Sequence, residues 1–168
     1  LAPVIKYYKQ ELIIPEGPGG GIEAEKTAYA EALEKIILET EALAENAKKN
    51  IGSSEAAIFD AHVMILQDPE LSSPIFASIE AGDNAVHAVS VNMDSLIEFF
   101  ESMDDAYMRE RAADMRDLKT RLISALLGVE FRDLSSLPEM AIIVASDLTP
   151  SDTAKIDKKH IAGIITEV

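Results

Sequence analysis

Hydrophobic residues recur with a helical period from residue 22 to about residue 51. From Ile22 to about Ile51, apolar residues recur at i, i+3, i+4 and i+7 with Glu and Lys between them, which predicts one long amphipathic helix. The apolar positions are Tyr29, Leu33, Ile36, Ile37, Leu43, Ala44 and Ala47. We expect Gly52 to end this helix and Ser53-Ser54-Glu55 to provide the N-cap of the next.

The second predicted helix is kinked. Residues 55–66 are apolar on nearly all sides, and Gln67-Asp68-Pro69 must interrupt them, because the residue before a proline is pushed out of the helical region. Asp68 as N-cap and Pro69 as first helical residue then restart a helix that runs to about Ala81.

Two further helices follow a break at Gly82-Asp83. The third covers 84–102, and the fourth covers 106–127, with Asp104-Asp105 as its cap and Gly128 at its end. Their apolar faces are predicted to consist of Val86, Val89, Met93, Leu96, Ile97 and Phe100 in the third, and of Met108, Arg111, Ala112, Met115, Leu118, Leu122 and Leu126 in the fourth.

Both ends of the chain have strand character. Residues 4–14 are rich in β-branched and aromatic types and predict one or two short strands, and residues 140–145 and 161–168 predict two more, with a turn at 146–153 and a helix at 154–160 between them. The breaker 15–21 lacks the spacing of a phosphate-binding glycine loop and is interpreted as a linker.

The simplest fold is α+β and mostly α: an antiparallel four-helix bundle, with a kinked second helix, inserted into a partial α/β subdomain. The predicted divisions are 1–21 for the N-terminal strands and linker, 22–129 for the helical subdomain, and 130–168 for the remainder of the α/β subdomain.

The amino-acid composition excludes several classes of function. The net charge of −15 argues against a nucleic acid or an anionic membrane as partner, and leaves open whether the acidic surface serves solubility or docking of a basic protein. The absence of cysteine excludes disulfides, thiolate catalysis and sulfur-ligated metals. No apolar run approaches the roughly 18 residues that a membrane span needs, and no signal peptide is apparent, so we expect a cytoplasmic protein.

The three histidines show no spacing typical of a metal site or a catalytic triad. His62 is expected to be packed within the second helix, His87 to lie on the surface, and His160 to complement the dipole at a helix end. The spacing of Asp114 and Asp117 could suit a metal, but arginines interleave with them at helical distances, so intrahelical ion pairs are the favoured interpretation.

The chain stops where an α/β unit normally presents reactive groups, after the carboxyl end of a strand. It also begins without Met. Both features suggest a piece of a longer protein.

Three motifs together are more specific. These are residues 55–71 (EAAIFDAHVMILQDPEL), residues 104–118 (DDAYMRERAADMRDL) and residues 147–153 (DLTPSDT). In this order and spacing they resemble the N-terminal domain of enzyme I, the phosphoenolpyruvate-protein phosphotransferase of the bacterial sugar phosphotransferase system. The resemblance extends over nearly the whole chain and implies the same fold.

Members of that family take phosphate from phosphoenolpyruvate onto a histidine and pass it to the carrier protein HPr. The resemblance implies that the phosphoryl-accepting histidine lies just after Val168, and that phosphoenolpyruvate and Mg²⁺ bind a C-terminal domain outside this chain. The 168 residues are therefore expected to be inactive alone, to hold no cofactor or metal, and to retain the HPr-docking module. A monomer is expected here, and a homodimer for the parent enzyme.

The resemblance also implies site residues. The HPr-binding face is expected to consist of Asp60, His62, Met64, Ile65, Glu70, Leu71, Tyr107, Met108, Arg111 and Asp114, some of which helical periodicity alone would assign to the core. Ser53 and Ser54 replace acidic residues of several family members. Thr153 is expected to be the hydrogen-bond partner of the absent histidine.

Two alternatives stay open at this point. One is an acidic helical-bundle adaptor without an enzymatic parent. The other is the enzyme I-like part of a dihydroxyacetone-kinase or nitrogen-regulatory phosphotransferase paralogue, which these residues do not separate from the sugar system.

Overall fold

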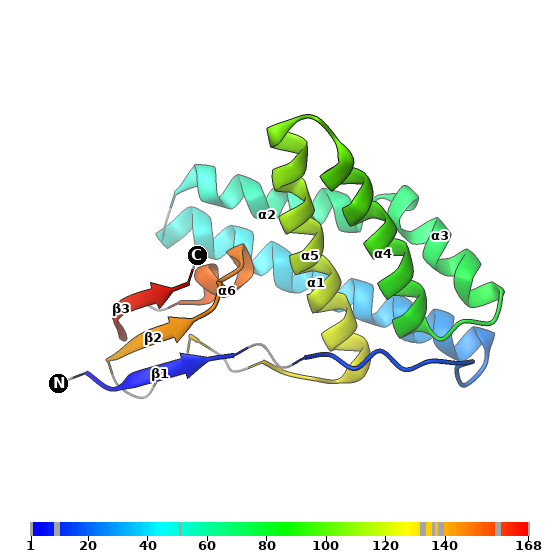
Figure 1. Ribbon diagram of the computed structural model, residues 1–168, viewed down its shortest axis with the longest axis horizontal. Coiled ribbons are helices and arrows are strands. Elements are labelled where there is room, and N and C mark those ends of the chain that lie inside the picture. Colours follow the sequence, from blue (N-terminus) through cyan, green and yellow to red (C-terminus); the bar gives the residue numbers. More distant parts are fainter. Residues whose placement is uncertain are drawn as a thin grey trace. The chain divides into compact units, whose positions relative to one another are not determined.

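The computed structural model describes residues 2–8, 11–50, 52–131, 134–135, 137, 140–156 and 159–167. The chain divides into two compact units (Figure 1). One consists of residues 12–129 and is helical, and the other combines residues 1–11 with 130–168 and contains the sheet.

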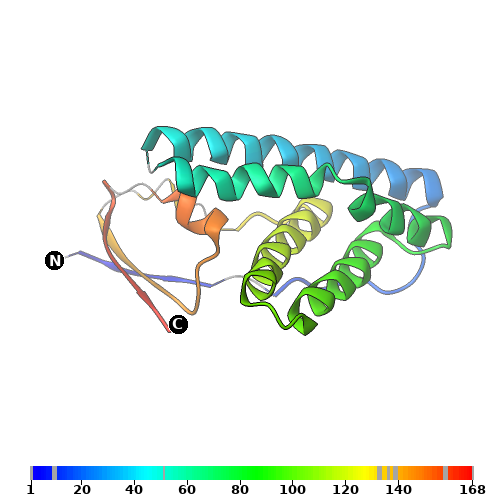
Figure 2. The same ribbon diagram turned by 90° about the horizontal axis from the view of Figure 1, so that it is seen from above.

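The helical unit contains α1 (Ile22–Asn50), α2 (Ser53–Leu66), α3 (Pro69–Glu80), α4 (Ala85–Ser102) and α5 (Ala106–Leu127). Helix α1 packs along α2, and α4 packs against α5 in a hairpin with a short connection (Figure 2). Helix α3 packs on α4 and α1. The predicted bundle with a kinked second helix is confirmed, the kink being the break between α2 and α3.

Local sequence explains most helix ends. The Asp68 carboxylate accepts from the Glu70 amide at 2.9 Å and Pro69 opens α3, as predicted. The Asp105 carboxylate accepts from the amides of Tyr107 and Met108 at the start of α5. Gly128 ends α5 with a φ of 65°, a conformation that costs a glycine little.

One predicted cap is wrong. Helix α2 already begins at Ser53, its N-cap is Gly52 in an extended conformation, and no side chain caps it. Ser53 and Ser54 therefore lie inside the first turn. The Gly52 amide donates to the carbonyl of Ala47 at 2.9 Å and thereby joins α2 closely to the end of α1.

A single apolar core holds the five helices together. Its largest fully buried members include Tyr29 from α1, Leu66 from α2, Ile75 and Ile79 from α3, Met93 from α4, and Leu118 and Leu122 from α5. The Tyr29 hydroxyl is 3.1 Å from the Ser72 hydroxyl, and its ring meets Phe76 edge to face. The predicted apolar faces of α1, α4 and α5 contribute to this core, except that Met108 and Arg111 of the predicted α5 face lie outside it.

The glycine-rich segment belongs to the helical unit, which differs from the sequence-based boundary at residue 21. Leu12 and Ile14 pack against the helical core. The Asn84 side-chain amide donates to the carbonyls of Pro15 and Gly17 at 3.0 and 2.8 Å. The segment is held against the start of α4 by these contacts.

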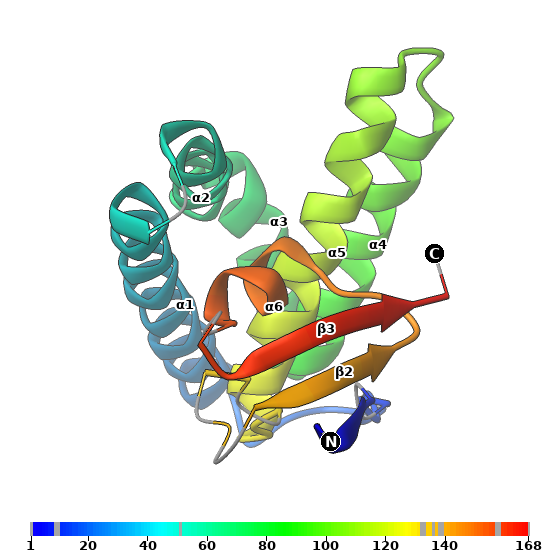
Figure 3. The ribbon, with the colours of Figure 1, turned by 90° about the vertical axis from the view of Figure 1, so that its left-hand side faces the viewer.

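The α/β unit contains β1 (Val4–Tyr7), β2 (Ala141–Ala145), α6 (Pro150–Lys155) and β3 (Ile161–Thr166). The three strands are parallel in the order β1-β2-β3, with Ile5 beside Ile143 and Ile143 beside Ile164, and Figure 3 shows α6 on one face. Tyr7, Leu134, Leu137, Ala141, Ile143 and Ala145 form its core.

The prediction of one or two short strands in residues 4–14 is confirmed, since the described residues there form one strand, β1, and Leu12 and Ile14 pack against the helical core. The predicted helix at 154–160 needs correction. Helix α6 starts at Pro150 and ends at Lys155, earlier than the predicted 154–160, because Thr149 caps it. His160 is consequently not at a helix end; its carbonyl accepts from the Ala141 amide at 2.9 Å beside β3. Asp157 and Lys158, also assigned to that helix, lie outside the described residues.

Candidate functional site

The residues that the resemblance assigns to docking come from α2, α3 and the first turns of α5. Met64 is 73% exposed and Tyr107 56% exposed, and Asp60 and Glu70 are also exposed. Ile65, Met108, Arg111 and Asp114 are partly buried. His62 and Leu71 lie in the interior at 0% and 7% exposure, behind the surface that the other residues form.

The start of α5 carries a connected polar group. Arg111 donates through Nη2 to the Tyr107 hydroxyl, and its guanidinium carbon lies 4.9 Å from the centre of the Tyr107 ring. Its Nη1 donates to Oδ2 of Asp114 at 3.1 Å. The hydrogen bond to Tyr107, followed by that to Asp114, outweighs the cost of partial burial and holds the pKa of Arg111 above its ordinary value.

The same carboxylate connects α5 to α2. Oδ1 of Asp114 lies 3.2 Å from Nε2 of His62. Burial alone would raise the pKa of Asp114, but the contact with His62 and then that with Arg111 together lower it below its ordinary value. Asp114 is therefore held as a carboxylate between two nitrogen groups.

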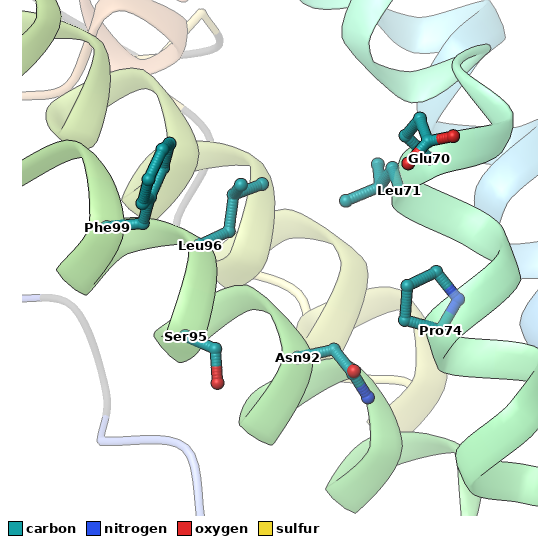
Figure 4. Close-up of a pocket in the computed structure, with 7 residues that line it drawn as sticks. All are labelled: Glu70, Leu71, Pro74, Asn92, Ser95, Leu96 and Phe99. Atoms are coloured by element: carbon teal, nitrogen blue, oxygen red, sulfur yellow. The ribbon is translucent and has the colours of Figure 1, made fainter.

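A groove of about 280 Å³ lies between α3 and α4 (Figure 4). Glu70, Leu71 and Pro74 line it from α3, opposite Asn92, Ser95, Leu96 and Phe99 from α4. Phe99 is 56% exposed. Sequence reasoning assigned Glu70 and Leu71 to docking but did not foresee the α4 wall, because its residues also fit an ordinary amphipathic helix.

The arginines of α5 approach carboxylates both within this helix and on other helices. Arg111 and Asp114 form the expected intrahelical pair. Arg116 instead pairs with Glu101 of α4, and Arg121 lies 3.9 Å from Glu39 of α1. The prediction of intrahelical pairing is thus confirmed for Arg111 with Asp114, and Arg116 pairs with a different helix.

In the α/β unit, Thr153 lies on α6 with its side chain exposed. Its hydroxyl donates to the Thr149 carbonyl at 3.0 Å. The turn beneath it is fixed by a capping box between Thr149 and Asp152, and Oδ1 of Asp152 accepts from the Tyr7 hydroxyl at 2.9 Å. With its proton committed, the Thr153 oxygen can still accept a hydrogen bond.

His87 lies 3.4 Å from Asp83 through Nδ1 and is 38% exposed at its side chain. Among the described residues, no three His, Asp or Glu side chains are placed to hold a metal ion. The described helices likewise include none with the length and apolar character to cross a membrane.

Comparison with known proteins identifies the fold. The N-terminal family of PEP-utilising enzymes matches residues 2–111, which is more than half of the chain. The chain belongs to this family.

Curated relatives of this family member are phosphoenolpyruvate-protein phosphotransferases. Those from Listeria innocua and Priestia megaterium are 41% and 40% identical to it over 99% and 100% of its length. The chain spans 28% and 30% of these two relatives.

Solved structures support the same assignment. A solution structure of an enzyme I protein superimposes with a TM-score of 0.87 at 36% identity, covering 99% of this chain and 68% of that one. The N-terminal domain of a protein described as Enzyme 1 - Nitrogen gives 0.75 at 25% identity, with 98% and 68% covered. The predicted fold and family resemblance are confirmed.

Proposed function

We propose that this PEP-utilising family domain is the HPr-docking module of an enzyme I-type phosphoenolpyruvate-protein phosphotransferase. The observation that carries the proposal is the match to an enzyme I structure over 99% of the chain at 36% identity. The names of the curated relatives support the same activity for the whole enzyme.

The chemistry of the surface suits a basic carrier. Met64 and Tyr107 offer exposed apolar area for the centre of an interface, and Asp60 and Glu70 add carboxylates near its edge. Asp60 lies 3.6 Å from Lys48 of α1. Carboxylates around an apolar centre steer a basic partner and set its orientation.

The groove between α3 and α4 extends this surface. Leu71, Pro74, Leu96 and Phe99 form its apolar wall beside Glu70, and of these Pro74 and Phe99 are exposed. An apolar side chain of the carrier that enters it would leave water while a neighbouring ammonium group pairs with Glu70.

For the whole enzyme we propose transfer of a phosphoryl group from phosphoenolpyruvate to a histidine outside these 168 residues and then to HPr. Positioning and electrostatic stabilisation dominate such transfers. Thr153 would accept from an imidazole N–H of that histidine, since its own proton is donated to Thr149. Mg²⁺ would also bind elsewhere, because the described residues offer no group suited to it.

Calorimetric titration with cognate HPr tests the docking proposal. Met64→Glu should weaken binding at least about tenfold by placing a charge at the apolar centre. Leu38→Glu is the matched control, since Leu38 is also exposed, at 58%, but lies on α1, which carries none of the proposed residues. Equal effects of both substitutions, or no binding by the unsubstituted chain, would contradict the proposal.

The adaptor without an enzymatic parent is not favoured, because its acidic surface alone does not account for the family match. The nitrogen-related structure is less similar to this chain than the enzyme I structure, at 25% against 36% identity. A cytoplasmic monomer that requires the rest of the enzyme for activity completes the proposal.

A further inference from the structure

His62 is a polar side chain in an apolar position. It lies in the middle of α2 with none of its side chain exposed, and Phe59 meets its ring edge to face at 5.9 Å. Among the described residues, neither ring nitrogen makes a hydrogen bond of good angle, and the Asp114 carboxylate at 3.2 Å is the polar contact of Nε2. Burying an imidazole with so few hydrogen bonds lowers the stability of the fold, so we expect His62 to have a function that offsets this loss.

The contact between His62 and Asp114 is the first of a series of polar contacts that extends from the core to the surface. His62 faces Oδ1 of Asp114, whose side chain is 15% exposed, and Oδ2 of Asp114 accepts from Arg111, which is 27% exposed. Arg111 in turn donates to the hydroxyl of the exposed Tyr107 and stacks over its ring. Each oxygen of the carboxylate thus contacts a nitrogen on a different side, and a buried group on α2 restrains an exposed group on α5.

We infer that His62 is a positioning residue for carrier docking: it does not touch the carrier but holds Asp114, and through it Arg111 and Tyr107, in the orientation that the carrier meets. The inference rests on the proposed docking function and assigns His62 a different role from a contact residue. Its burial excludes direct contact in this conformation. A fixed guanidinium loses less rotamer freedom on binding than a free one, which is how preorganisation raises affinity.

Two substitutions separate the polar contact from packing. His62→Leu fills similar space without a donor, whereas His62→Gln keeps an N–H group at a reach close to that of Nε2. In calorimetric titrations with HPr, we expect His62→Leu to weaken binding about tenfold and His62→Gln to stay within about threefold of the unsubstituted chain. Equal weakening by both would overturn the inference, as would no weakening by His62→Leu.

Repeating the His62 substitution in a chain that lacks the Arg111 side chain shows whether His62 affects binding by positioning Arg111. In a chain with Arg111→Ala, His62→Leu should change the dissociation constant less than about twofold, because the group that His62 positions is gone. Loss of affinity to the same degree in both backgrounds indicates general damage to the helical unit and contradicts the positioning role. Thermal unfolding of every variant identifies any that fail to fold. If His62→Leu fails to fold, His62→Gln can still be measured.

A measurement without the carrier keeps this inference distinct from the proposed function. The Nη–Hη signals of Arg111 in NMR spectra should be sharp and slow to exchange in the unsubstituted chain and His62→Gln, because Nη1 and Nη2 donate to Asp114 and Tyr107, and should be broadened or lost in His62→Leu. An Arg111 signal that does not respond to His62→Leu refutes the positioning role even if HPr binds. Absence of HPr binding, with the Arg111 signal responding, would refute the docking function alone.

Discussion

At the scale of single residues, Asp114 is the point where stability and the proposed function meet. Its carboxylate lies between His62 and Arg111 and its pKa is lowered, chiefly because these contacts outweigh its burial. A carboxyl group whose pKa is lower in the folded than in the unfolded state stabilises the fold once it is ionised. The contribution is complete above the unfolded value of about 3.9 and is lost as the pH falls through the lower folded value.

Asp114→Asn should therefore destabilise the chain most at pH 5 and above. The difference in free energy of unfolding between the unsubstituted chain and this variant should shrink as the pH falls below the unfolded value of about 3.9, since protonation removes from Asp114 the charge that Asn lacks at every pH. Urea denaturation across this range measures it. A difference that does not change with pH would show that Asp114 has no lowered pKa in the folded chain.

Gly19 is a second residue whose identity matters, here because of close approach. A Cβ on Gly19 would lie 2.0 Å from Oε1 of Glu25, whose carboxylate accepts from the amides of Gly20 and Ala85 at 2.8 Å each. Gly19→Ala should displace Glu25 and lower the free energy of unfolding by about 1–3 kcal/mol.

Gly20→Ala is the control for this prediction. The nearest atom to its added Cβ would be Oε1 of Glu25 at 3.9 Å, an ordinary contact. Thermal or urea unfolding that gives the same loss for both alanines would mean that Glu25 does not hold the segment. A loss confined to Gly19→Ala would establish that Gly19 is required for the close approach of Glu25.

At the scale of elements, the first turns of helix α5 are capped by Asp105 and carry several of the proposed docking residues. Asp105→Ala removes the acceptor for the Tyr107 and Met108 amides and should cost about 1 kcal/mol of stability. It should also weaken HPr binding, because Tyr107 and Arg111 lie in the first turns that the cap orders. Unfolding and calorimetry measure the two effects.

Asp104→Ala tests whether this effect comes from the cap or from charge. Asp104 is fully exposed, and its ion pair with Arg109 is distant, at 3.9 Å. It carries the same charge beside the same helix but does not cap it. A loss of stability from Asp104→Ala as large as that from Asp105→Ala would contradict the capping account.

The elements also show which structural features a sequence determines locally. Asp68-Pro69, Asp105 and Gly128 were assigned correctly because each acts through its own neighbouring backbone. The start of α6 was placed too late, since Thr149 and Asp152 satisfy each other only when Thr149 is the N-cap. Apolar periodicity gave the helix faces, and so the bundle, correctly.

Hydrophobic periodicity could not predict the contacts between segments that are distant in the sequence. The pairing of His62 with Asp114, and of Arg116 with Glu101, depends on how α2, α4 and α5 pack. The role of Glu25 at the start of α4 depends in the same way on a loop whose glycines looked like a linker. The docking residues themselves came from family resemblance, and their role stays a prediction.

At the scale of the whole molecule, the net charge of −15 and the family assignment bear on the same proposal. An acidic domain attracts a basic carrier over a distance of roughly a Debye length, about 8 Å at physiological ionic strength. The helical unit carries the proposed docking residues, and the α/β unit carries Thr153. The central claim is therefore that carrier binding is a property of the helical unit.

The most direct test is an NMR titration of the ¹⁵N-labelled chain with unlabelled HPr. The account predicts chemical-shift changes concentrated in α2, α3, the α4 wall of the groove and the first turns of α5, with β1, β2 and α6 little affected. Changes concentrated in the α/β unit, or no changes at an excess of HPr, would contradict it.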